Sequence, residues 1–278
     1  MAKIGVFDSG YGGLTILDAI RRELPEYDYI YLGDNARAPY GTHSFDVIYR
    51  YTLEAVRYLF EQDCTLVILA CNTASAKALR TIQQHDLPPF REGWGRPVNV
   101  LGVIRPTVEA VPAISKTGHV GILATPATVS SESYVLELEK VSKGLRVTQQ
   151  ACPMWVPLIE SGEHMSEGAD YFVEKYLREI MDRDPKIDTL VLGCTHYPLM
   201  EAKIEKWIEV EKGGISIISQ GSLVAESLKD YLNRHSEYRA QLSQNGTCAY
   251  LTTENADRFA QSASQFIGEQ IGAQHINL

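Results

Sequence analysis

The stretch Leu66-Val67-Ile68-Leu69-Ala70-Cys71-Asn72-Thr73 is the clearest indication of the fold, because an apolar run of strand length ends directly at small polar residues. The second half of the chain repeats this design at Leu190-Val191-Leu192-Gly193-Cys194-Thr195-His196. Ligands in open parallel sheets lie beyond the carboxyl ends of the strands. The two stretches therefore predict parallel strands that each deliver one cysteine, Cys71 or Cys194, to a site.

On both sides of these strands, short apolar runs alternate with longer amphipathic segments. Regular alternation of strands and helices predicts an α/β fold with mostly parallel strands. The expected strands are Lys3–Phe7, Asp28–Gly33, Thr65–Ala70, Val98–Val103, His119–Ala124, Leu145–Ala151, Thr189–Gly193 and Ile215–Ser219. The expected helices are Gly13–Glu23, Ser44–Gln62, Ser75–Gln84, Pro106–Ala113, Thr128–Lys140, Ser166–Met181, Pro198–Lys212, Ser222–Tyr231 and Ala256–Ile267.

The two halves of the chain are similar to each other. They begin alike, at Ile4-Gly5-Val6-Phe7 and Val120-Gly121-Ile122-Leu123. The separation of these two beginnings along the chain is close to the separation of Cys71 and Cys194. This similarity predicts two related α/β halves that arose by duplication. The Pro- and Gly-rich stretch Pro88–Pro97 interrupts the alternation and predicts a linker, and Lys212-Gly213-Gly214 marks a second candidate boundary.

Composition narrows the class of protein. The chain has 278 residues, of which 45% are hydrophobic and 22% charged, as in ordinary globular proteins. The net charge of -9 argues against a nucleic-acid partner, because phosphate binding needs a basic surface. The sequence contains no apolar stretch that would span a membrane and no recognisable signal peptide, so we expect a cytoplasmic protein. Five cysteines without a Cys-x-x-Cys pair predict free thiols and no metal site.

Polar residues follow several of the expected strands. The first strand leads into Asp8-Ser9-Gly10, and the second leads into Gly33-Asp34, with Pro39-Tyr40-Gly41 just beyond. Asp8 either caps the following helix or lies beside a thiol and controls its protonation. For Asp34, the alternative to a functional role is a surface ion pair with Arg37 that has little consequence.

Position distinguishes Cys71 and Cys194 from the other thiols. Each follows a strand at the expected N-terminus of a helix, where the pKa of a thiol falls and the reactive thiolate forms. Cys194 also has His196 two residues away, which suits a base or a proton partner. Two similar thiols suit a reaction that removes a proton from one face of a carbon and returns it to the other. The remaining cysteines, which lack this context, are assigned to packing: Cys64, Cys152 and Cys248.

Four motifs together resemble the glutamate racemases of the aspartate/glutamate racemase superfamily. They are Asp8-Ser9-Gly10-Tyr11-Gly12-Gly13-Leu14, Gly33-Asp34-Asn35-Ala36-Arg37-Ala38-Pro39-Tyr40-Gly41, Ala70-Cys71-Asn72-Thr73-Ala74-Ser75 and Gly193-Cys194-Thr195-His196-Tyr197-Pro198-Leu199. The cysteine motifs are shared widely in the superfamily. The motifs that contain Tyr40 and His196 are more specific to the glutamate enzymes.

The resemblance implies two similar doubly wound parallel-sheet domains that face each other across the active site. The first domain would be discontinuous, with residues 1–97 and 214–278, and the second would span residues 98–213. The resemblance further implies racemisation of glutamate without a cofactor or metal, with Cys71 serving the D-enantiomer and Cys194 the L-enantiomer. It also implies a supply of D-glutamate for peptidoglycan, and a homodimer.

The roles of site residues follow from the resemblance position by position. Cys71 and Cys194 match the two catalytic cysteines, and Asp8 and His196 match the residues that assist them. Asp8 and His196 also belong to the substrate-binding positions. The other substrate-binding positions are matched by Ser9, Tyr40, Gly41, Asn72, Thr73 and Thr195. Two acidic residues, Asp34 and Glu160, match further positions near the site.

Two places depart from the family pattern. Arg105-Pro106-Thr107 stands where an acidic residue, Pro and Gly are usual, and Ser219-Gln220-Gly221 stands where an Asp-containing turn is usual. Both bear on domain contact and regulation rather than on the reaction.

Three other functions stay open: a racemase for aspartate or another small acidic substrate, a thioester-forming hydrolase with Cys194 as nucleophile and His196 as base, and a non-catalytic binding module.

Overall fold

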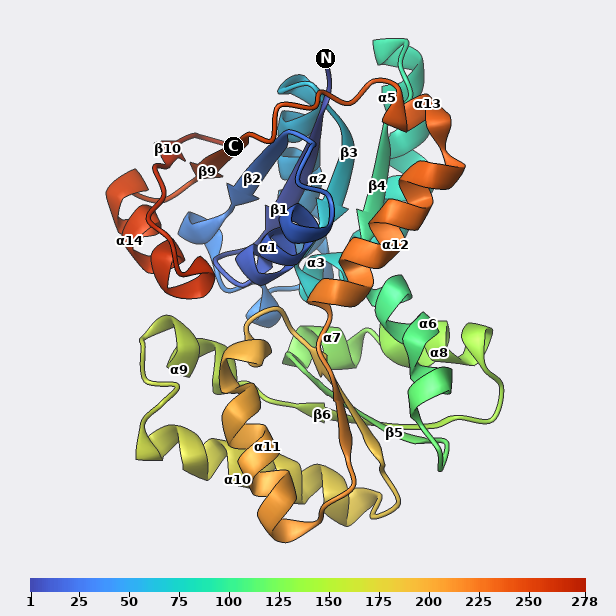
Figure 1. The fold of residues 1–278 in the computed structure, drawn as a ribbon, viewed down its shortest axis with the longest axis vertical. Coiled ribbons are helices and arrows are strands. Elements are labelled where there is room, and N and C mark those ends of the chain that lie inside the picture. The colour runs from blue at the N-terminus through green and yellow to red at the C-terminus, as the bar shows by residue number, and fades with distance from the viewer. The chain divides into compact units, whose positions relative to one another are not determined.

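A computed structural model describes residues 1–278, apart from the side chain of Gln265. The chain divides into two compact units, of which the first contains Met1–Val103 and Gly221–Leu278 and the second contains Ile104–Gln220. Each unit has its own parallel sheet with helices around it (Figure 1). The prediction of an α/β fold with two parallel sheets is confirmed. None of the described helices is long and apolar enough to cross a membrane.

The sheet of the first unit has the strand order β10-β9-β2-β1-β3-β4, and every pairing in it is parallel. Its strands are β1 (Lys3–Asp8), β2 (Tyr29–Gly33), β3 (Cys64–Leu69), β4 (Asn99–Gly102), β9 (Cys248–Thr252) and β10 (Gln274–His275). The inner strands β2 and β3 are buried along their whole length. Near-continuous apolar runs such as theirs are typical of strands that are covered on both faces.

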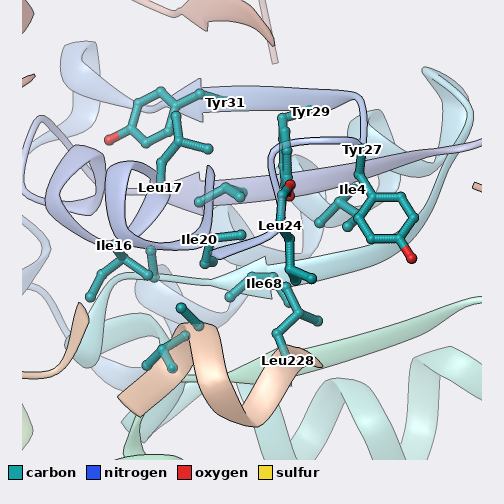
Figure 2. Packing of buried hydrophobic residues seen from close by; sticks show 14 of the residues in the cluster. Ile4, Ile16, Leu17, Ile20, Leu24, Tyr27, Tyr29, Tyr31, Ile68 and Leu228 are labelled. Atoms are coloured by element: carbon teal, nitrogen blue, oxygen red, sulfur yellow. Dashed lines mark hydrogen bonds between the residues drawn. The ribbon is translucent and has the colours of Figure 1, made fainter. Parts of the chain in front are cut away.

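Helices cover both faces of this sheet. One face carries α1 (Gly13–Glu23), α12 (Gly221–Arg234) and α14 (Ala256–Ile267), and the other carries α2 (Phe45–Glu61). Figure 2 shows Ile20 of α1 and Leu228 of α12 close to Ile68 of the sheet, and Ile4 and Ile16 belong to the same buried cluster. Figure 1 shows α14, in red, beside β9 and β10 at one edge of the sheet.

The helical region after β3 is longer than predicted. It consists of α3 (Asn72–Lys77), α4 (Leu79–Thr81), the π-helical turn η3 (Ile82–Asp86) and α5 (Leu87–Trp94). The prediction of a linker over Pro88–Pro97 was therefore wrong for most of that stretch. Proline fits the first turn of a helix, where its missing N–H is not needed, and Gly95 ends α5 with a φ of 56°. Phe90 and Trp94 stack at 5.7 Å and both meet Phe60 of α2 edge-on.

The sheet of the second unit has the strand order β6-β5-β7-β8 and is parallel throughout. Its elements are α6 (Ile104–Ile114), β5 (His119–Ala124), α7 (Pro126–Ser130), α8 (Ser133–Val141), β6 (Arg146–Ala151), α9 (Trp155–Glu160), α10 (Glu167–Arg183), β7 (Thr189–Gly193), η4 (Tyr197–Met200), α11 (Glu201–Glu211) and β8 (Ser216–Ile218). Gly121 lies against Ile180 of α10, whereas Gly193 lies against Tyr134 of α8. The two helices therefore cover opposite faces.

The division into units differs from the expected one at both boundaries. The strand expected at Val98–Val103 was placed in the second domain, but β4 pairs with β3 and belongs to the first sheet. The strand expected at Ile215–Ser219 was placed in the first domain, but β8 pairs with β7 and belongs to the second sheet. The chain thus changes units directly after an edge strand each time, and not at the glycine- and proline-rich stretches.

The C-terminal part of the first unit is tied to β2 by a buried carboxylate. Asp28 is 3% exposed and accepts hydrogen bonds from the backbone and hydroxyl groups of Thr247, at 2.8 and 2.7 Å, and from the amide of Asn245 at 2.7 Å. These contacts place the segment that leads into β9 beside β2, where the two strands pair.

Candidate active site

Cys71 lies just beyond the end of β3 and is the N-cap residue of α3. Its side chain is 6% exposed. The sulfur accepts a hydrogen bond from the backbone N–H of Ala74 at 3.4 Å, and the hydroxyl of Ser9 lies 3.4 Å from the same sulfur. Ser9 directly follows β1, the neighbour of β3 in the sheet. Donors of this kind favour the thiolate form of a cysteine.

Asp8 is the last residue of β1 and is fully buried. Its carboxylate accepts a hydrogen bond from the N–H of Gly10 at 2.9 Å, and its carbonyl accepts one from the N–H of Asp34 at 3.0 Å. The hydroxyl of Tyr31 donates to the carbonyl of Gly10 at 2.9 Å. A Cβ atom at Gly13 would lie only 2.5 Å from the Cβ of Asp8, so a larger residue there would displace this side chain.

Asp34 is not part of a surface ion pair, because its side chain is fully buried. It accepts hydrogen bonds from the hydroxyls of Tyr40 and Thr253, the latter at 2.8 Å, and Nε of Arg37 lies 2.7 Å from its carboxylate. Burial, together with the charge of Asp34, holds the pKa of Tyr40 far above its usual value. Tyr40 therefore stays protonated as a donor, and the network fixes the loop that contains η1 (Asn35–Arg37) and η2 (Tyr40–Thr42).

In the second unit, Cys194 directly follows β7 and is 5% exposed. Its sulfur lies 3.9 Å from Nδ1 of His196, and Nε2 of His196 lies 3.0 Å from Oε1 of Glu160. Burial lowers the pKa of His196, but its hydrogen bonds with Cys194 and Glu160 outweigh burial and raise it to about 10. His196 is therefore a cation at neutral pH that donates to both neighbours.

Glu160 reaches His196 because α9 is held against the start of η4. The hydroxyl of Tyr197 donates to the carbonyl of Cys152 at 3.2 Å. The rings of Trp155, at the start of α9, and Tyr197 meet edge-on with centroids 4.7 Å apart. Glu160 ends the helix that this aromatic contact packs against Tyr197, the residue after His196.

The two thiols have different surroundings. Cys71 caps a helix and has a serine neighbour, whereas Cys194 has an imidazole that is itself paired with a carboxylate. Sequence reasoning expected both cysteines at helix N-termini, but Cys194 is followed by the short 3-10 turn η4. The sulfur of Cys71 thus has a backbone N–H and a hydroxyl beside it, and the sulfur of Cys194 has an imidazole.

The other expected site residues flank these groups. Asn72, Thr73 and Thr195, which adjoin the two cysteines, are almost fully buried, and Gly41 is half-buried in the loop with Tyr40. The structure brings together Ser9 with Cys71, Asp34 with Tyr40, and Cys194 with His196 and Glu160. Within the described part of the chain, no group of three or more His, Cys, Asp or Glu side chains is placed to hold a metal ion.

Three buried residues of the second unit were not predicted as part of a site: Thr107 and Gln220 were noted only within segments that depart from the family pattern, and Tyr134 was not noted. The side-chain amide of Gln220 donates to the hydroxyls of Thr107 and Tyr134, at 2.8 and 3.0 Å. Tyr134 packs against Gly193, the residue before Cys194. The signal for Gln220 was its place in a segment that departs from the family pattern, but the sequence contained no indication of its partners.

Each unit thus presents one almost fully buried thiol just beyond the carboxyl end of a parallel strand, with a hydroxyl beside one sulfur and an imidazole beside the other, an arrangement that suits an enzyme that transfers protons. The sequence profile of the Asp/Glu/Hydantoin racemase family matches residues 9–228. The chain belongs to this family.

Individual relatives match almost the whole chain. A glutamate racemase of Ruegeria sp. (strain TM1040) is 40% identical over 96% of this chain and 97% of its own. The crystal structure of a glutamate racemase from Bacillus anthracis matches with a TM-score of 0.87 at 32% identity, over 100% of this chain and 98% of its own. That of the Francisella tularensis enzyme, in complex with D-glutamate, matches with a TM-score of 0.84 at 30% identity, over 100% of this chain and 97% of its own.

Proposed function

We propose that this protein interconverts L- and D-glutamate and does so with two cysteines as acid and base. The observation that carries the proposal is the similarity to glutamate racemases at 40% identity over 96% of the chain. The sites of the two units support it, because each presents one almost fully buried thiol next to a group that stabilises the thiolate. Aspartate is a second candidate substrate only through the breadth of the family.

The proposed reaction consists of two proton transfers. A thiolate takes the α-proton of glutamate, so that the C–H bond breaks, an S–H bond forms and the electron pair stays on carbon as a carbanion. The other cysteine, as a thiol, then gives its proton to the opposite face of that carbon. Cys194 takes the proton from L-glutamate and Cys71 takes it from D-glutamate. The proposal requires that both sulfurs reach the α-carbon of one bound glutamate.

The difficult part of this reaction is the weak acidity of the α-proton. Positioned donors that face the developing negative charge lower this barrier most in a site without water. Asn72, Thr73 and Thr195 are suitable donors, since they are buried beside the cysteines. Ser9, Tyr40 and Gly41 are proposed to bind the substrate, together with Asp8 and His196.

The acid–base partners have distinct proposed roles. His196, which is positively charged at neutral pH, stabilises the thiolate of Cys194, and Glu160 keeps His196 charged. Asp8 is proposed to assist Cys71 from the end of the neighbouring strand. Asp34 acts through Tyr40, because its carboxylate accepts the hydrogen bond that the Tyr40 hydroxyl donates.

Three further proposals rest on the resemblance of the sequence motifs rather than on the site. The protein works in the cytoplasm, supplies D-glutamate for peptidoglycan and forms a homodimer. The two-thiol reaction that we propose draws on no cofactor.

The proposal is tested by circular dichroism of L- and D-glutamate solutions and by incorporation of solvent deuterium at the α-carbon. The parent protein, Cys71→Ser, Cys194→Ser and the control Cys248→Ser are compared, with aspartate measured in parallel. We expect the parent and the control to racemise glutamate, and each site variant to lose racemisation by about a thousand-fold. Racemisation at the parent rate in either site variant contradicts the two-base assignment. Loss only in Cys194→Ser, with a trapped acyl-enzyme, indicates a hydrolase.

A further inference from the structure

The chain passes between its two units twice, at Val103–Ile104 and at Gln220–Gly221. Gln220 is therefore the last residue of the second unit, and it is only 2% exposed. Its amide nitrogen donates to the hydroxyl of Thr107 at 2.8 Å and to the hydroxyl of Tyr134 at 3.0 Å. Thr107 lies in the first turn of α6, where the chain has just entered the unit. One buried amide thus links the entry and exit segments of the chain to α8.

Tyr134 connects Gln220 to β7, the strand that ends just before Cys194. The side chain of Tyr134 is fully buried. A Cβ atom at Gly193 would lie 3.1 Å from Cε2 of Tyr134, so the ring lies directly against the backbone of β7 at its end. Gly193 precedes Cys194, and a shift of this ring would therefore move the backbone that sets the position of the sulfur.

The neutral amide of Gln220 is compatible with a thiolate at Cys194. An amide holds the Tyr134 hydroxyl through a neutral donor and adds no charge to the interior. A carboxylate in its place would repel the thiolate of Cys194 and would lack the N–H groups that both hydroxyls accept from. Burial, followed by the electrostatic influence of Cys194, raises the pKa of Tyr134, so the phenol stays protonated.

We infer that Gln220 is a positioning residue for Cys194. Through Tyr134 it holds the end of β7, and so the sulfur that exchanges the α-proton of L-glutamate. The inference rests on the proposed racemisation of glutamate. It concerns one of the two proton transfers only, because Gln220, Thr107, Tyr134 and Cys194 belong to the same unit.

The test measures which proton transfer slows. The two enantiomers have equal free energy, so kcat/KM must fall equally in both directions whichever step is impaired. Primary deuterium isotope effects separate the steps, because α-deuterated L-glutamate reports on transfer to Cys194 and α-deuterated D-glutamate reports on transfer to Cys71. The variant is Gln220→Met, which keeps the length of the side chain and removes both donors. The control is Gln83→Met, which also removes an amide donor, the one to the carbonyl of Val100 at 2.8 Å, but in the first unit.

We expect Gln220→Met to lower kcat/KM about ten-fold, because of the two hydrogen bonds that are lost the one to Tyr134 is the one that connects Gln220 to β7. The isotope effect with L-glutamate should rise and that with D-glutamate should fall, whereas Gln83→Met should leave both unchanged. Lower activity with unchanged isotope effects overturns the inference, because a general loss of packing would give that result. A parent protein without α-proton exchange instead overturns the proposed function.

Tyr134→Phe keeps the inference testable if Gln220→Met does not fold. Phenylalanine retains the ring on Gly193 and removes the hydroxyl that accepts from Gln220. We expect the same opposite changes of the two isotope effects. Where both variants fold, the double variant should lose no more activity than Gln220→Met alone, because both changes act through one contact. Additive losses, or isotope effects that do not change in opposite directions, overturn the inference.

Discussion

The Nε2 atom of His196 lies 3.0 Å from Oε1 of Glu160, while Nδ1 of the same ring lies 3.9 Å from the sulfur of Cys194. The imidazole is thus held between two acidic groups in a place where it is 4% exposed. Burial opposes a charge on the ring, but the two hydrogen bonds raise the pKa of His196 to about 10. Glu160 is the partner that can be altered without touching the thiol.

Glu160→Gln should lower the pKa of His196 toward its ordinary value of 6.5. The amide keeps the shape of the side chain but no longer balances the imidazolium. At neutral pH the Cys194 thiolate then loses its cationic neighbour, and we expect kcat with L-glutamate to fall about a hundred-fold. The measurements are the NMR titration of the His196 ring and the pH profile of kcat. Glu163→Gln, an exposed neighbour in sequence, is the control.

The same pair contributes to stability with a definite dependence on pH. The pKa of His196 is raised in the folded state, so its stabilising contribution is complete below about 6.5 and is lost as pH rises through about 10. The difference in free energy of unfolding between the parent and Glu160→Gln should therefore shrink between these two values. Urea unfolding at several pH values measures it, and a difference that grows with pH would show that Glu160 does not stabilise the charged ring.

Ser9→Ala should make Cys71 less reactive. The serine hydroxyl lies 3.4 Å from the sulfur of Cys71, and a donor at that place stabilises the thiolate. We expect alkylation by iodoacetamide to slow about ten-fold at neutral pH. The measurement uses a Cys194→Ser background, so that Cys71 is the thiol followed. Burial raises the pKa of Cys64 to about 12 and that of Cys248 to about 11, so these thiols react slowly. An unchanged alkylation rate would exclude Ser9 as a donor to Cys71.

The parts of the fold that could be predicted from sequence are those set by local patterns. The helix expected at Gly13–Glu23 and the strand expected at Thr189–Gly193 have the predicted bounds. The boundaries between units could not be predicted in this way, because they depend on which sheet an edge strand joins. The strands near residues 100 and 217 are short and carry no local sign of their partner. The helix α5 was missed because Pro and Gly were interpreted as loop residues, although both also occur at helix ends.

The same distinction applies to the candidate site. Cys194 and His196 are two residues apart, so the sequence already placed them together. Glu160 was assigned only by resemblance, since it comes from a helix that had not been predicted. The contact between Gln220 and Tyr134 joins residues far apart in the chain. No periodicity or spacing indicates such a pair, because it results from tertiary packing.

Tyr40→Phe should weaken substrate binding and the stability of the loop together. It removes the hydroxyl that donates to the fully buried Asp34, which then keeps Arg37 and Thr253 as partners. We expect a loss of about 1 kcal/mol in free energy of unfolding, and a several-fold higher KM for both enantiomers. Tyr49→Phe is the control, because Tyr49 also donates its hydroxyl to a carboxylate, that of Asp86 at 2.7 Å, in the same unit. The control should lose stability without a change in KM, and a normal KM in Tyr40→Phe would separate the tyrosine from substrate binding.

Asp28→Asn tests how the first unit is closed by its C-terminal segment. Burial raises the pKa of Asp28, but hydrogen bonds from Ser243, Thr247 and Asn245 outweigh it and hold the pKa well below the usual 3.8. A lowered pKa means that the carboxylate stabilises the fold above the unfolded value and that this contribution is lost as pH falls below it. Replacement by asparagine should cost about 2 kcal/mol at neutral pH and progressively less in acid, as measured by urea unfolding. Asp18→Asn, which alters an exposed pair with Arg22, should cost little at any pH. Equal losses in the two variants would mean that the link between β2 and the segment before β9 does not depend on the charge of Asp28.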